Sequence, residues 1–195
     1  MKRRTTLWCI VGVRLMLLWA GIADADPQHL NRLLHGDYTV LGEGTCLVAL
    51  PPGFNPDLTP IDVRFTFSFS TQGIRTFHGD GTGTVHSRSV SVTHPATPIT
   101  IDYQASFTYI VAPDRTVTVV SGPVTGTVFT GSRARQTFTL DPFPVLTGLI
   151  ALDDKSLTLA SEEPTVEVQT FSNGDVHYRI CHRSSILLKL NHAED

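Results

Sequence analysis

The residues best suited to chemistry in this 195-residue chain form a short alternating row near its C-terminal end. Four side chains recur there at every second position: His177, Arg179, Cys181 and Arg183. Side chains at this spacing share one face of a strand. If that face is enclosed, the buried arginines need carboxylates or an anionic ligand, and Glu43 is a candidate partner. A second interpretation places the row on the solvated face, with any disulfide outside the sheet.

The cysteines indicate how the chain closes. Cys9 falls within a predicted leader, so Cys46 and Cys181 remain to form a disulfide, as two cysteines in an exported chain usually do. Their bond would join a first long strand, 38–50, to a last one, 176–190, with Cα atoms about 4.4–6.8 Å apart. Such a bridge suits a closed barrel or a tightly packed sandwich.

Motif searches assign no catalytic residue. The chain contains no G-x-S-x-G, H-E-x-x-H, C-x-x-C or P-loop sequence. Its eight histidines include no pair at i, i+2 spacing that would place two ligands on one strand face. We therefore predict no metal site and no cofactor.

The first 25 residues have the pattern of a secretory signal peptide. Basic residues 2–4 precede an apolar stretch, and Ala-Asp-Ala at 23–25 supplies a cleavage site. The apolar stretch is too short for a permanent transmembrane helix. The pattern predicts export to the periplasm or the extracellular space.

Charge narrows the expected partners. The leader carries four of the 15 lysines and arginines and one of the 18 acidic residues, so the mature chain would have a formal net charge of −6. Only Lys155 and Lys189 remain as lysines. An acidic surface lacks the basic clusters that neutralise phosphates, which excludes nucleic acid and anionic membranes. We expect a monomer with a small apolar or anionic ligand.

Alternating polarity predicts an all-β fold. Phenylalanines occupy every second position of 64–70, and 103–111 places three aromatic rings on one face opposite polar residues. One apolar, buried face and one polar, solvated face are typical of an antiparallel sheet. Turn sequences separate such runs at 79–81, 113–115, 131–133, 153–155 and 172–175.

The predicted architecture is an antiparallel β-barrel of about eight to ten strands, with a β-sandwich as the alternative. A short N-terminal helix, 26–35, follows the signal peptide, and 36–195 form a single domain.

Two stretches carry a family resemblance. Residues 79–84 are GDGTGT, and 157–183 contain TFSNG and end in ICHR. In these motifs the chain resembles a group of exported bacterial proteins of unknown function with calycin or allene oxide cyclase-like barrels. The resemblance implies a barrel and conveys no activity.

Three functions remain open at this stage. The first is a small-molecule-binding module, since a barrel of about eight strands can hold one small ligand. The second is a cofactor-independent cyclase or isomerase that holds a reactive substrate, with Arg179, His177 and Glu43 as polar anchors. The third is a surface interaction or structural module.

Overall fold

The computed structural model describes residues 27–62, 64–93 and 97–191. Eleven strands and one short helix make up this part of the chain. In chain order they are α1 (Pro27–Asn31), β1 (His35–Ala49), β2 (Arg64–His78), β3 (Thr82–Val92), β4 (Ile99–Val111), β5 (Thr116–Ser121), β6 (Val124–Val128), β7 (Thr137–Asp141), β8 (Leu146–Ile150), β9 (Ser156–Ser161), β10 (Val166–Phe171) and β11 (Val176–Lys189).

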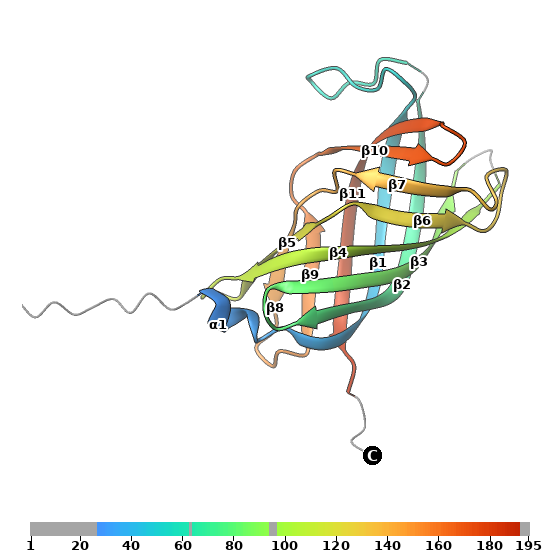
Figure 1. The fold of residues 1–195 in the computed structure, drawn as a ribbon. Coiled ribbons are helices and arrows are strands. Elements are labelled where there is room, and N and C mark those ends of the chain that lie inside the picture. The colour runs from blue at the N-terminus through green and yellow to red at the C-terminus, as the bar shows by residue number, and fades with distance from the viewer. Residues whose placement is uncertain (1–26, 63, 94–96, 192–195) are drawn as a thin grey trace, which may run out of the picture.

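A single antiparallel sheet closes on itself (Figure 1). Eight strands form a ring in the order β1-β2-β3-β4-β5-β8-β9-β11, and pairing of β1 with β11 completes it. The fold is all-β and barrel-like, as the alternation predicts. The described strands number eleven rather than eight to ten.

Two long strands change partners along their length. β4 pairs with β6 through residues 101–104 and with β5 through 107–111. β11 likewise pairs with β10 through 176–180 and with β9 through 184–188. The wall therefore has two ends, which we call the β7 end (β6, β7, β10) and the β8 end (β5, β8, β9). In Figure 1 the β7 end lies above the β8 end.

Aromatic packing fills the β8 end. The ring of Phe77 makes edge-to-face contacts with Tyr38, Phe107 and Tyr109, at centroid distances of 5.3, 5.2 and 5.0 Å. All four rings are buried. Edge-to-face contact is a geometry that aromatic pairs favour. These rings belong to the main hydrophobic cluster, which also contains Leu34.

The segment around α1 covers this end. The Tyr109 hydroxyl lies 3.0 Å from the carbonyl oxygen of Asn31 and 2.8 Å from that of Leu34, and it accepts a hydrogen bond from the Gly79 N–H. The Asn31 side-chain oxygen accepts from the N–H of Val111 at 2.9 Å. The buried Tyr109 hydroxyl and the Asn31 side-chain oxygen thus have partners.

A disulfide joins the first strand to the last. Cys46 and Cys181 are directly opposite in the β1–β11 ladder and form a bridge across a sequence separation of 135. Their Cα atoms are 4.1 Å apart, slightly closer than the range expected from the sequence. The pairing and the strands that carry it are those predicted.

The predicted signal peptide, 1–25, lies outside the described residues, as do two of the eight histidines, His94 and His192. Within the described part of the chain, no helix is long and apolar enough to cross a membrane.

Candidate functional site

The interior is left unfilled from the middle of the ring toward the β7 end. A partly open cavity of about 180 Å³ lies there. Phe65, Phe67 and Phe69 of β2 line it, and all three remain partly exposed. An apolar cavity of about 150 Å³ is enough to bind one benzene ring. This cavity therefore has room for a single ring or a short chain.

The neighbouring wall reverses the usual polarity of a strand. On β3, Ser87 and Ser89 are buried and line the cavity, whereas Val90 and Val92 lie outside with 43% and 57% of their surface exposed. The Ser89 hydroxyl donates to the carbonyl oxygen of Ser70 at 2.9 Å. Hydroxyl groups thus replace aliphatic side chains on this part of the interior.

The predicted row on β11 faces the interior. Cys181 is buried, and the side chains of Arg179 and Arg183 are only 12% and 11% exposed. Both arginines line the cavity, as does His177. Of the two interpretations of this row, the structure places it inside the ring.

The carboxylate that pairs with these arginines is Glu167 of β10. It is fully buried, its Oε2 accepts from Arg179 Nε at 2.8 Å, and its Oε1 forms an ion pair with Arg183. Burial lowers the pKa of Arg179, an effect that the charge of Glu167 opposes and that of Arg183 reinforces. One carboxylate therefore serves two guanidinium groups.

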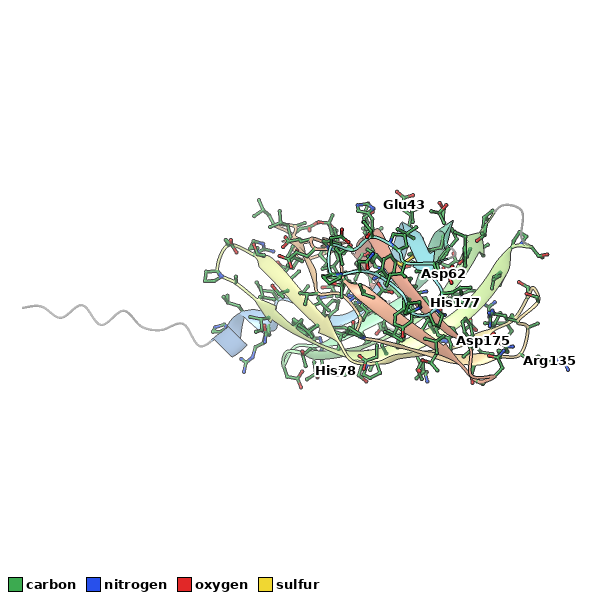
Figure 2. All side chains as sticks on the ribbon, turned by 90° about the horizontal axis from the view of Figure 1, so that it is seen from above. Glu43, Asp62, His78, Arg135, Asp175 and His177 are labelled. Carbon is green, nitrogen blue, oxygen red and sulfur yellow. A yellow bond between two sulfur atoms is a disulfide. The ribbon has the colours of Figure 1, made fainter. Side chains whose placement is uncertain are left out.

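The choice of Glu43 as their partner was wrong. Glu43 is exposed and lies an odd number of residues from Cys46, so its side chain projects from the opposite face of β1. In Figure 2 it points away from the sheet. Glu43 borders the cavity, but its side chain is exposed.

The sequence did contain a signal for Glu167. Residues 172–175 were predicted as a hairpin turn. Pairing the residues on either side of this turn places Glu167 within one position of the residue that faces Arg179. The structure pairs the two directly across β10 and β11. Opposite charges at facing positions are a favourable cross-strand pair.

His177 lies in a charged cluster at the β7 end (Figure 2). Arg133 donates to Asp175 at 2.7 Å, approaches His177 Nε2 to 3.2 Å and lies over the ring of Phe171. Burial, with the charges of Arg133 and Arg179, lowers the pKa of His177, while Asp175 opposes the shift. The imidazole is therefore neutral at pH 7. His182 is exposed on the other face of β11, as the odd spacing predicted.

Arg75 of β2 is an interior cation that sequence analysis missed. It is 7% exposed, and its guanidinium lies 4.9 Å from the ring centre of Phe107. Its Nε and Nη1, like Ser87 Oγ, have no hydrogen-bond partner among the described residues. Burial lowers the pKa of Arg75 to about 10, so it stays charged at neutral pH. Its even spacing from Phe69 and Phe77 was a usable signal for an inward position.

The site thus combines an aromatic wall, hydroxyl groups and an excess of guanidinium groups. Within the described ranges, no group of three or more His, Cys, Asp or Glu side chains is arranged to hold a metal ion. Comparison with protein-family models and with curated proteins finds no match. The calycin-like resemblance therefore stays a prediction.

Proposed function

We propose that this protein is an exported small-molecule-binding module that holds its ligand inside the ring of strands. The cavity carries this proposal. Protein interiors normally pack as densely as organic crystals, and unfilled space forfeits contacts. Here three phenylalanines line an open space of about 180 Å³ instead of filling it. A ligand with an apolar body would supply the missing contacts.

Export has two supports, one in the sequence and one in the fold. The leader pattern at 1–25 predicts secretion. The bridge between Cys46 and Cys181 is of a kind that persists in oxidising compartments such as the periplasm or the extracellular space.

Thermal unfolding in the presence of small hydrophobic compounds tests the proposal. The panel should contain monocyclic phenolics, short fatty acids and short isoprenoids, since the cavity takes one ring or a short chain. A ligand present at about 100 times its Kd should stabilise the protein by about 2.7 kcal/mol. If every compound leaves the midpoint unchanged at saturating concentration, the proposal fails.

A matched pair of β3 variants locates the binding. Ser89→Leu would place an aliphatic side chain in the cavity and should abolish the stabilisation. Val90→Leu changes the adjacent, outward position and should leave binding intact. Undiminished binding by Ser89→Leu would contradict an interior site.

An enzyme of the cyclase or isomerase kind is the second candidate. A neutral imidazole, that of His177, lines the cavity beside Arg179 and can accept a proton. The other anchor expected from the sequence, Glu43, is exposed. Mass spectrometry of compounds recovered after incubation distinguishes the two functions, because an enzyme would return a rearranged product and lose it in His177→Gln.

A further inference from the structure

Arg75 differs from the other three arginines that line the cavity. Arg133 forms an ion pair with Asp175. Arg179 and Arg183 share the carboxylate of Glu167. Arg75 has no ion pair among the described residues, and two of its nitrogens lack a hydrogen-bond partner there. Its contact with the face of Phe107 offsets part of the cost of burying a cation. A buried guanidinium still requires an anion.

Hydroxyl groups lie beside Arg75 on the adjacent strands. Arg75 faces Val85 across β2 and β3, so Ser87, two residues further along β3, is its diagonal neighbour on the same face. The Ser87 hydroxyl is buried without a partner in the described part of the chain. On β4, Tyr103 faces Ser87, and its hydroxyl lies 2.9 Å from that of Thr71. These side chains all line the cavity.

Gly73 allows this arrangement. It lies opposite Ser87 on β2, and a Cβ at this position would come within 2.3 Å of Ser87 Oγ and of the His86 carbonyl oxygen. Only glycine lets the serine side chain lean against β2 between Thr71 and Arg75. The donors are thus gathered on one patch of the wall.

The charges around the cavity do not balance. Four arginines line the cavity. Arg179 and Arg183 share the one buried carboxylate, Glu167, and Arg133 pairs with the exposed Asp175, which leaves Arg75 without an ion pair among the described residues. The interior is therefore locally positive within a chain whose formal net charge is −3. A neutral ligand would leave the charge of Arg75 uncompensated.

We propose that the ligand is a small amphipathic acid whose oxyanion head is bound by Arg75 with Ser87 and Tyr103, while its apolar body extends along the cavity toward Phe69, the nearest of the three phenylalanines. This inference rests on the proposed function and specifies the ligand class. Guanidinium and hydroxyl donors suit a carboxylate, and a phosphate monoester presents the same oxygen acceptors. The cavity volume limits the body to one ring or a short chain.

Titration calorimetry with matched pairs of compounds tests the head group. Benzoate, phenylacetate and hexanoate are the acids; benzamide, benzyl alcohol and hexanol are neutral compounds of similar body, and phenyl phosphate tests the alternative oxyanion. Acids should bind about tenfold or more tightly than the neutral compounds, since hydrogen bonds to charged groups are the stronger ones. Tighter binding of phenyl phosphate than of the carboxylates would assign the head as a phosphate.

The outcomes separate the two proposals. Neutral compounds that bind as tightly as the acids would overturn the oxyanion site and leave the interior binding function standing. Failure of every compound to bind would overturn both.

Variants assign the site to Arg75. Arg75→Met keeps an apolar chain and removes the charge, so acids should bind about tenfold or more weakly and neutral compounds as before. Arg135→Met, at an exposed turn position (Figure 2), is the control and should match the unaltered protein. If Arg75→Met does not fold, Ser87→Ala should still weaken acids selectively by a few-fold. Unchanged affinity for acids in a folded Arg75→Met, or in Ser87→Ala, would overturn the assignment.

Discussion

The two ends of the interior are packed differently, although the same long strands pass through both. β2 runs through both ends, and its inward positions are phenylalanines at each. At the β8 end Phe77 is buried among three other rings. At the β7 end Phe65, Phe67 and Phe69 stay partly exposed around a cavity.

The difference lies in what surrounds these rings. Tyr38, Phe107 and Tyr109 pack around Phe77, whereas the three phenylalanines of the other end line a cavity that serines and arginines also line. Buried apolar contacts stabilise a fold, and polar groups held inside a cavity reduce its stability while they enable binding. The comparison teaches that the β8 end maintains the fold, whereas the interior from the middle of the ring to the β7 end carries the site.

Glu167→Gln should have the largest effect. Removing the carboxylate leaves Arg179 and Arg183 buried without an anion, which should lower the free energy of unfolding by about 3–5 kcal/mol. Phe77→Ala should cost a similar amount, about 3–5 kcal/mol, through a cavity in the β8 end. Chemical denaturation measures both.

Added sulfate distinguishes these two variants. It should stabilise Glu167→Gln more than Phe77→Ala, because only the first exposes unpaired guanidinium groups to an anion. Equal stabilisation of both variants by sulfate would contradict the assigned difference between the ends.

Loss of the disulfide should weaken both ends together, because β1 and β11 run through each. Replacement of Cys46 and Cys181 by alanine should reduce the free energy of unfolding by about 2–5 kcal/mol, the typical cost of removing a native disulfide. Hydrogen exchange should accelerate along both strands over their whole length. Acceleration confined to the β7 end would show that the bridge supports the site alone.

Matched tyrosine variants compare the polar groups of the two ends. Tyr109→Phe removes contacts to Asn31, Leu34 and Gly79 in a buried place, so it should cost about 1–3 kcal/mol. Tyr103→Phe removes a contact to Thr71 in a partly exposed place and should cost about 0.5–1.5 kcal/mol. A larger loss for Tyr103→Phe in denaturation experiments would reverse the comparison.

His177 should give the β7 end a modest pH dependence. Its folded pKa is lowered below the ordinary value of about 6.5, so the unfolded chain binds more protons in the window below that value. Its contribution is fully present above about pH 6.5 and is lost as the pH falls through the folded pKa. Since the imidazole is only partly buried, solvent screening should keep the effect below about 1 kcal/mol.

Unfolding midpoints measured from pH 7.5 to 5 test this sign. His177→Gln should lose less stability over this range than the unaltered protein does. An equal or steeper loss in the variant would contradict the lowered pKa.

The sequence predicted much of the fold because its strands alternate and its turns are explicit. Residues 103–111 point as the alternation requires, and Cys46 pairs with Cys181 as predicted. The phenylalanine face of 64–70 also points inward. These features depend on local periodicity, which a single sequence displays.

The orientation of the site could not be predicted in the same way. The usual rule turns apolar residues inward, but β3 buries Ser87 and Ser89 and β10 buries Glu167 between two partly exposed valines. This inversion is a property of the cavity and is invisible to a periodicity argument. Glu43 was chosen for its charge, although strand parity relative to Cys46 already placed it on the other face.

The stability of Arg75→Met without ligand tests the central claim most directly. The measurement is the free energy of unfolding of protein refolded from denaturant, so that no bound molecule is carried over. If Arg75 is retained to bind an anion, replacing its unpaired buried charge by an apolar chain should leave the fold as stable or stabilise it by about 1 kcal/mol or more. A loss of more than about 2 kcal/mol would show that Arg75 supports the fold, and would contradict the division of the interior into a packed end and a binding end.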